Sequence, residues 1–196
     1  MYKMITTPRI LVFAGSLRQE SFNKRLARIG AGAAREAGAD VTLVDLLDYP
    51  MPIFNQDDEE AHGMPEHARR FKQLLREHHG FFIASPEYNS GISGVLKNAI
   101  DWASRAESPE EPPVVAFRGK TGALVSASIG ALGGLRGLVN VRTILGNIGM
   151  ILLPDQVCIP NAEEAFLGPD SLKDRRKQEQ VEALAHQLVE FTRKVA

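Results

Sequence analysis

The feature that most constrains the fold is a regular alternation of short apolar runs with longer amphipathic segments. Residues 9–14 and 80–84 are almost entirely apolar, and each run is followed within two residues by glycine or proline. Such runs are typical of strands that are buried on both faces of a parallel sheet. The segment 23–38 instead repeats apolar residues at helical spacing and ends at a glycine. The pattern therefore predicts an α/β protein.

Five strands and five helices are expected. The predicted strands are 9–14, 40–47, 80–84, 120–127 and 150–159. The predicted helices are 23–38, 64–79, 93–105, 135–148 and a C-terminal helix with apolar residues at Val181, Leu184, Leu188, Phe191 and Val195. Right-handed crossovers favour a flavodoxin-like, five-stranded parallel sheet of order 2-1-3-4-5 with helices on both faces. The length of 196 residues predicts a single domain spanning 1–196.

Composition excludes several classes of protein. The 23 Lys and Arg residues nearly balance the 24 Asp and Glu residues, which argues against nucleic-acid binding. A single cysteine, Cys158, excludes an internal disulfide and a clustered-thiolate metal site. Because the histidines lack metal-ligand spacing, no metal is expected. No apolar stretch reaches the ~20 residues that span a bilayer, and residues 1–9 lack an apolar signal core, so we expect no membrane insertion and a cytoplasmic location.

The loop after the first predicted strand is rich in hydrogen-bond donors. It carries Ser16, Arg18, Ser21 and Asn23 and leads directly into a helix. Hydroxyls, a guanidinium and free helical N–H groups suit a dianionic phosphate, although the spaced glycines of nucleotide-binding fingerprints are missing. The alternative is that Ser21 is only a helix N-cap and Arg18 a solvated surface charge. Spacing alone does not decide between the two.

The loops after the third and fourth predicted strands are also unusual. In 85–94, proline and glycine residues enforce a turn that projects Tyr88 and Asn89, which suits a flat heterocycle. In 126–136, three closely spaced glycines permit a ligand to approach the backbone. Each loop also has a plainer interpretation, as an ordinary turn before a helix. In a sheet of this order, all three loops lie where ligands bind, outside the carboxyl ends of the strands.

Several other features carry no chemistry in this interpretation. The stretch 30–32 resembles part of a dinucleotide motif but falls inside a predicted helix. A solvated helix end accounts for His78 and His79, because cations are favoured at helix C-termini. Cys158 falls in a predicted strand and is interpreted as a small buried hydrophobe.

Four motifs together carry a resemblance to a known family. They are Gly15-Ser16-Leu17-Arg18 with Ser21 and Asn23, Ser85-Pro86-Glu87-Tyr88-Asn89, Gly94 with 96–102, and Gly130 with 133–136. The chain resembles the flavodoxin-like NADPH-dependent FMN reductase family, which includes bacterial quinone, azo-dye and chromate reductases. The resemblance covers about residues 9–160, and the motifs occur in the expected order on the expected elements.

The resemblance implies a cofactor, a reaction and a set of site residues. The residues expected to hold the FMN phosphate and ribityl chain are Ser16, Arg18, Ser21, Phe22 and Asn23. Those expected to border the isoalloxazine ring are Pro86, Glu87, Tyr88 and Asn89 on one side and Ser128, Gly130 and Gly133 on the other. The implied reaction is hydride transfer from NADPH through FMN to a small acceptor, such as a quinone, a free flavin, an azo dye or a metal oxyanion. Because the flavin carries this chemistry, no catalytic side chain is expected.

The resemblance also implies a homodimer or homotetramer. Residues 48–57 match the family's loop near the subunit contact, and their apolar side chains would otherwise leave an unexplained patch on a monomer. The alternative is that this loop folds back onto its own domain. Two other functions stay open: a flavodoxin-type electron carrier, against which the near-neutral charge argues, and a flavin-free regulatory protein.

Overall fold

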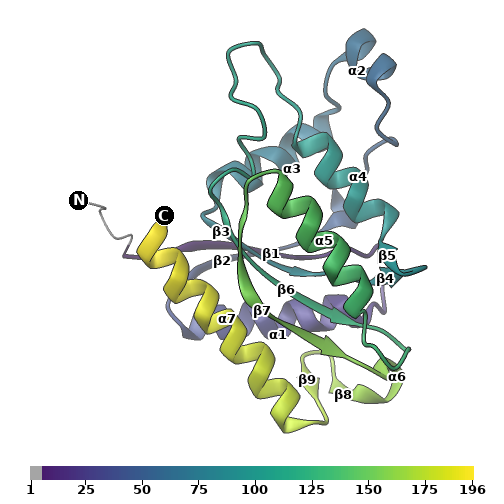
Figure 1. Ribbon diagram of the computed structural model, residues 1–196, viewed down its shortest axis with the longest axis vertical. Helices are drawn as coiled ribbons and strands as arrows, with labels where there is room; N and C mark the ends of the chain where they lie inside the picture. Colours follow the sequence, from purple (N-terminus) through teal and green to yellow (C-terminus); the bar gives the residue numbers. More distant parts are fainter. Residues whose placement is uncertain (1–5) are drawn as a thin grey trace.

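The computed structural model describes residues 6–196 and contains a five-stranded parallel sheet (Figure 1). Its strands follow the order β2-β1-β3-β6-β7, and each neighbouring pair is parallel. The strands are β1 (Arg9–Ala14), β2 (Asp40–Asp45), β3 (Gly80–Ala84), β6 (Thr121–Ala127) and β7 (Ile151–Ile159). Numbered within this sheet, the order is 2-1-3-4-5, so the predicted flavodoxin-like topology is confirmed. Part of the N-terminal stretch in which no signal core is expected lies outside the described residues, and the single domain over 1–196 stays a prediction.

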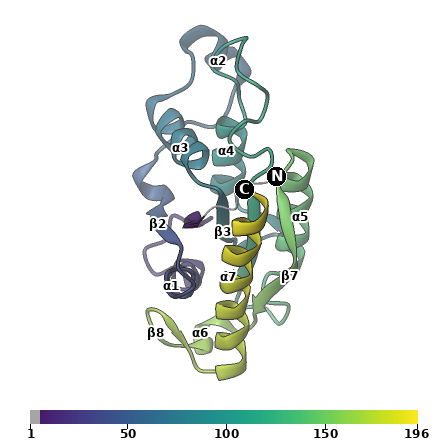
Figure 2. The ribbon, with the colours of Figure 1, turned by 90° about the vertical axis from the view of Figure 1, so that its left-hand side faces the viewer.

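Helices cover both faces of the sheet (Figures 1 and 2). One face packs against α1 (Phe22–Glu36) and α7 (Arg175–Val195). The other packs against α3 (Glu66–Glu77), α4 (Gly94–Ala103) and α5 (Leu135–Asn147). Successive residues of β1 enter these two cores alternately, with Ile10 and Val12 in the first and Leu11 and Phe13 in the second. This alternation explains why the strand is apolar throughout.

Some boundaries differ from the prediction for local reasons. The second strand ends at Asp45 instead of residue 47, because the Asp45 carboxylate accepts a hydrogen bond from the N–H of Leu47 and caps a 3₁₀ turn, η1 (Leu46–Asp48). The five predicted helices leave out the segment 48–63, but it contains the short exposed helix α2 (Gln56–His62), which Asn55 caps.

The sequence pattern predicted no helix or strand between β7 and the C-terminal helix. It contains α6 (Ala162–Ala165) and a two-stranded hairpin of β8 (Phe166–Gly168) and β9 (Ser171–Leu172). These elements are too short to produce a periodic signal. The C-terminal helix then begins at residue 175, where the side chain of Asp174 caps its first turn.

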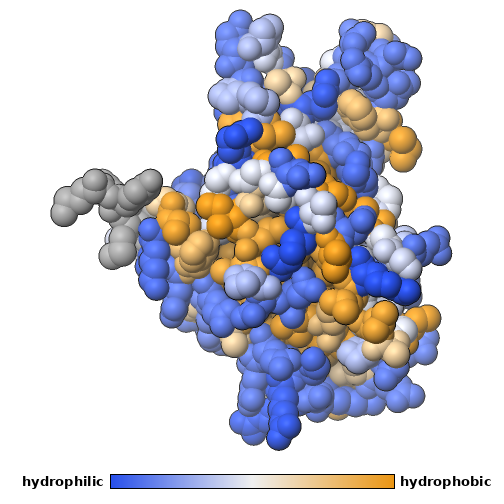
Figure 3. All heavy atoms as spheres, in the orientation of Figure 1, coloured by the Kyte–Doolittle hydropathy of each residue, from blue (hydrophilic) through white to orange (hydrophobic). Residues whose placement is uncertain are grey.

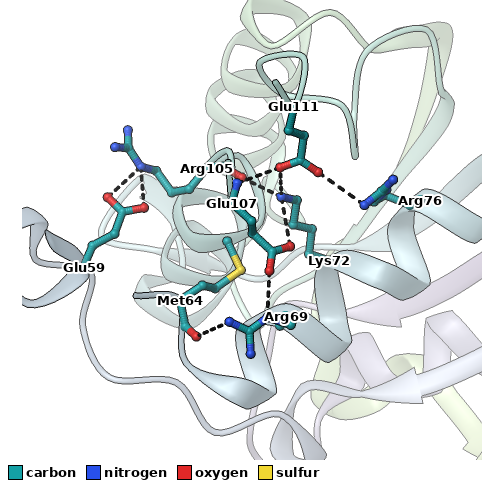
Figure 4. A network of polar contacts seen from close by, with 8 residues as sticks. All are labelled: Glu59, Met64, Arg69, Lys72, Arg76, Arg105, Glu107 and Glu111. Carbon is teal, nitrogen blue, oxygen red and sulfur yellow. Dashed lines mark hydrogen bonds and ion pairs between the residues drawn. The ribbon is translucent and has the colours of Figure 1, made fainter. Parts of the chain in front are cut away.

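A buried lysine anchors the loop after α4 to α3 (Figure 4). Lys72 is 1% exposed, and its ammonium donates to the Glu111 carboxylate at 2.5 Å and to the carbonyl oxygen of Arg105 at 2.8 Å. It also lies 3.2 Å from a carboxylate oxygen of Glu107. Arg69 and Arg76, from the same helix, pair with Glu107 and Glu111. Charge pairing therefore fixes Glu107 and Glu111, and with them part of the loop between α4 and β6.

The interpretation of His78 and His79 as a solvated helix end is wrong. His78 is buried; its Nδ1 contacts the carbonyl oxygen of Leu74 at 2.6 Å and its Nε2 contacts Oγ1 of Thr42 at 2.8 Å. The Nδ1 atom of His79 accepts a hydrogen bond from the N–H of Arg9. Burial lowers the pKa of both imidazoles below the ordinary value. The pair is therefore part of the neutral packing between α3 and the sheet.

Candidate functional site

A cavity of about 200 Å³ lies at the carboxyl ends of β1, β3 and β6, and we call it the polar cavity because hydroxyl, guanidinium, amide and carboxylate side chains take part in its lining. It brings together nine of the residues that the sequence predicts: Ser16, Arg18, Ser21, Phe22, Asn23, Pro86, Glu87, Tyr88 and Ser128. Ala127 and Ile129 complete the lining and were not predicted. Both flank the predicted Ser128, which was the available signal for them. The predicted residues Asn89, Gly130 and Gly133 do not line this cavity.

The loop between β1 and α1 contributes two serine hydroxyls to the cavity, and one of them belongs to the N-cap of a 15-residue helix. Ser21 is the N-cap, and its Oγ accepts a hydrogen bond from the N–H of Lys24 at 3.4 Å. The Oγ of buried Ser16 accepts from the N–H of Arg18 at 3.3 Å. Each hydroxyl keeps its own proton for donation. Together with the positive end of the helix dipole, they make this corner favourable for an anion.

Asn23 holds two of the cavity walls together. Its Nδ2 donates to the carbonyl oxygen of Ala127 at 2.9 Å, and its Oδ1 accepts from the N–H of Ala127 at 3.0 Å. The buried amide therefore fixes the end of β6 against the first turn of α1. Since both of its polar atoms are paired with the backbone, Asn23 shapes the cavity through its position.

The loop after β3 forms a tight hairpin of β4 (Glu87–Tyr88) and β5 (Gly91–Ile92). Its two turn residues, Asn89 and Ser90, have φ values of 50° and 67°, in the left-handed region. Two-residue hairpin turns require such values, which asparagine tolerates better than most residues. The hairpin leaves the ring of Tyr88 half exposed at the cavity edge and turns Asn89 out of the lining.

Glu87 connects this hairpin to α5. Its carboxylate accepts hydrogen bonds from the guanidinium of Arg136 and from the N–H of Gly137. Burial alone would raise the pKa of Glu87, but the bonds from Gly137 and Arg136 outweigh it, so the pKa lies below the ordinary value. The carboxylate is therefore charged and neutralised by its partners, which limits its repulsion of an anion in the cavity.

The glycines after β6 serve packing. A Cβ atom on Gly133 would lie 2.8 Å from the carbonyl carbon of Ile159, and one on Gly134 would lie 1.9 Å from Oγ of Ser126. Both glycines have positive φ angles, 59° and 91°. Their backbone thus folds closely over the ends of β6 and β7, which places Ser128 in the cavity wall. A Cβ on Gly130 would meet nothing closer than Oγ of Ser128, at 3.8 Å.

A second cavity, of about 190 Å³ and mostly apolar, lies on the other side of the β1–α1 loop. Leu17 lines it, whereas Ser16 and Arg18 line the polar cavity. The remaining lining residues are Leu46, Leu47, Tyr49, Pro50, Met51, Val95, Asn98 and Ala99. The β1–α1 loop therefore separates the two cavities.

The segment 48–57 forms part of the wall of this apolar cavity and folds back onto α4. The carbonyl oxygen of Pro52 accepts from the indole N–H of Trp102 at 2.8 Å and from Nδ2 of Asn98 at 2.9 Å. The ring of Phe54 packs edge-on against Trp102. Ile53, in contrast, is 79% exposed. The segment thus contacts its own domain and still presents an apolar side chain outward.

Three findings concern metal binding, membrane crossing and the single cysteine. Across residues 6–196, no three His, Cys, Asp or Glu side chains are grouped so that they could hold a metal ion. Over the same residues, no helix is both long and apolar enough to cross a membrane. Cys158 is half-buried, and burial raises the pKa of its thiol, which makes it a poor nucleophile.

Comparison with known proteins places this arrangement in a family. Residues 8–164 match the NADPH-dependent FMN reductase family. A 2-hydroxy-1,4-benzoquinone reductase from a Burkholderia species is 37% identical over 146 residues, which are 74% of each chain. An NAD(P)H-dependent FMN reductase from Pseudomonas aeruginosa is 34% identical over 175 residues, which are 89% of each chain. The chain belongs to the NADPH-dependent FMN reductase family.

The solved structures agree in fold. The flavoenzyme NAD(P)H:(acceptor) oxidoreductase FerB from Paracoccus denitrificans superposes with a TM-score of 0.78, over 96% of this chain and 99% of that one, at 24% identity. The activity rests on the family match and the two relatives, which establish a flavin-dependent oxidoreductase that uses FMN and a reduced nicotinamide nucleotide. The reductase interpretation is therefore favoured over the electron carrier.

Proposed function

We propose that the polar cavity holds the phosphate and ribityl chain of FMN against the first turn of α1. The donors are the hydroxyls of Ser16 and Ser21, the guanidinium of Arg18 and the free N–H groups of the helix start. Among the described residues, Arg18 has no carboxylate partner, so its charge is available to an anion. This concentration of donors at one helix N-terminus is the observation that carries the proposal.

The isoalloxazine ring would then lie between the β4–β5 hairpin and the loop after β6. Pro86 and Tyr88 border one side, and Ser128 with Ile129 borders the other. Asn23, Glu87 and Gly133 act through the positions of the walls. When bound, FMN would supply the redox chemistry, which is hydride transfer from a reduced nicotinamide nucleotide to the acceptor. The side chains bind and orient the ring, and none is needed to move a proton.

For the acceptor, we infer a small oxidised molecule, with quinones to be tested first. The support is the names of the relatives, several of which are quinone reductases. Free flavin, azo dyes and metal oxyanions are the other candidates. Initial rates with each class, at fixed NADPH, would rank them. NADPH is expected to outperform NADH, and equal kcat/KM values for the two nucleotides would contradict this preference.

The decisive experiment is a visible absorption spectrum of the purified protein, before and after anaerobic addition of NADPH. A yellow protein that bleaches supports both flavin binding and the reductive half-reaction. A yellow protein that stays coloured would favour a carrier that a separate reductase supplies with electrons. A colourless protein that takes up no added FMN would contradict the proposal and favour a flavin-free role.

We also infer a cytoplasmic homodimer or homotetramer. Ile53, within the segment 48–57, and Leu47, directly before it, expose apolar side chains, which supports the interface expected there. Figure 3 shows further hydrophobic residues gathered around α5, where Leu135 and Val139 are exposed. Such patches are unusual on monomers. Light scattering at working concentration tests this assembly, and a monomer mass would contradict it.

A further inference from the structure

The cavity wall has an aromatic neighbour beyond the residues that match the family. Phe22 lines the cavity, and its ring stacks on that of Phe166 in β8, with 5.8 Å between centroids and 11° between planes. Phe166 follows the last matched residue, 164, and is 9% exposed. The wall of the proposed cofactor site thus rests on a hairpin that the family match does not include.

Arg25 extends this contact to the β1–α1 loop. Its guanidinium carbon lies 5.8 Å from the ring centroid of Phe22 and 5.7 Å from that of Phe166, which are distances typical of cation–π contacts. The same guanidinium donates to the carboxylate of Glu20 at 3.1 Å. One side chain therefore joins the donor-rich loop, the cavity wall and the hairpin.

A third contact fixes the turn of the hairpin. Nε of Arg28 donates to the carbonyl oxygen of Pro169, between β8 and β9, at 3.1 Å. Phe22, Arg25 and Arg28 are three residues apart, so they share one face of α1. Figure 2 shows β8 beside this helix, on the side opposite α3 and α4. The hairpin is thus attached along the N-terminal half of α1.

We propose that Phe166 of the β8–β9 hairpin is a positioning residue of the cofactor cavity, acting through Phe22 and Arg25 to determine how tightly FMN is held. The inference rests on the proposed function of the cavity. Phe22 starts the helix whose first turn faces the phosphate, so loss of its stacking partner frees the ring and the Arg25 side chain together. The side chains of the wall then have to become ordered when FMN binds, and the entropy cost of this ordering weakens the affinity for FMN.

The test compares FMN affinity in two variants of the same hairpin. Phe166→Ala removes the stacked ring, whereas Leu172→Ala removes a buried side chain from the paired strand and keeps the stack. Titration of full-length apoprotein, followed by the quenching of FMN fluorescence, gives Kd, and thermal unfolding gives Tm. We expect both variants to lower Tm. Because only Phe166→Ala removes the aromatic pair, only this variant should raise Kd. The rise should be about fivefold, which corresponds to the contribution of about 1 kcal/mol of such a pair.

Two more variants keep the inference falsifiable. Phe166→Tyr retains the ring and should restore the wild-type Kd, and Arg25→Met should raise Kd by a smaller factor. An unchanged Kd in Phe166→Ala, or an equal rise in Leu172→Ala, would overturn the positioning role even though wild-type protein binds FMN. A wild-type protein that binds no FMN would overturn the proposed function itself, and the inference with it.

Discussion

The carboxylate of Glu87 lies 2.6 Å from Nη2 of Arg136 and forms an ion pair with it. Nε of Arg136 donates to the same oxygen at 2.9 Å, and the N–H of Gly137 donates to the other at 3.0 Å. A negative charge at the start of α5 is favoured by the helix dipole. The pair joins the β4–β5 hairpin to the helix that follows the third loop, so two cavity walls are fixed to each other.

Replacing Glu87 by Gln should lower the free energy of unfolding by about 1.5–3 kcal/mol, since a buried carboxylate loses its charge-assisted hydrogen bonds. Urea unfolding at pH 7 measures this. The exposed Glu163 of α6 provides a matched control, and Glu163→Gln should stay within about 0.5 kcal/mol of wild type. Equal effects of the two substitutions would contradict the role of Glu87.

The same residue predicts part of the acid sensitivity. The pKa of Glu87 is lower in the folded protein than its ordinary value of 4.5, so its contribution is complete above that pH and is lost as the pH falls further. Wild-type protein should therefore lose more stability than Glu87→Gln as the pH falls from about 5 to about 3, through and below that value. Parallel pH profiles for the two proteins would count against it.

Arg18→Ala should raise the Kd for FMN by about tenfold, because a phosphate dianion loses a charge-assisted partner. Riboflavin, which lacks the phosphate, should bind both proteins with similar affinity. As a control, Arg175→Ala removes a guanidinium that is 90% exposed in the first turn of α7, and it should leave both affinities unchanged. An FMN titration with the same Kd in Arg18→Ala and wild type would remove Arg18 from the site.

The sequence predicted the central strands well and the roles of some site residues less well. Strands β1, β3 and β6 are buried on both faces, so their apolar runs are local signals. The role of Asn23 depends on Ala127, which is 104 residues away. Gly133 likewise is constrained by the backbone of Ile159, a contact that spacing within one loop cannot reveal.

The short elements illustrate the other limit. The β8–β9 hairpin has five strand residues in all, and its position depends on Phe166 meeting Phe22 across the fold. The prediction that His78 is solvated was wrong for the same reason, because its ring contacts the hydroxyl of Thr42 in β2, far away in the sequence. The local sequence pattern predicts the helices and strands, whereas the packing between them determines which side chains are buried and what they contact.

Stability should fall as the pH decreases through the normal range of histidine. Burial keeps the pKa of His78 and His79 below 6.5 in the folded protein, so the unfolded chain binds protons first. The contribution is complete above pH 6.5 and decreases below it. Thermal unfolding at several pH values should show a flatter profile for His78→Gln than for wild type. His62→Gln, on the exposed helix α2, should keep the wild-type profile.

Lys72→Met should destabilise the protein by about 3–5 kcal/mol, because it leaves the carboxylates of Glu107 and Glu111 without their buried partner. Arg69→Met, which removes a half-exposed member of the network, should cost less than about 1 kcal/mol.

In the double variant with Glu111→Gln, the cost should be smaller than the sum of the single costs, since the charges compensate each other. The network joins α3 to the loop after α4 and includes no residue that lines the polar cavity, so FMN affinity should stay unchanged in folded variants. Additive costs in urea unfolding would show that Lys72 and Glu111 do not interact energetically.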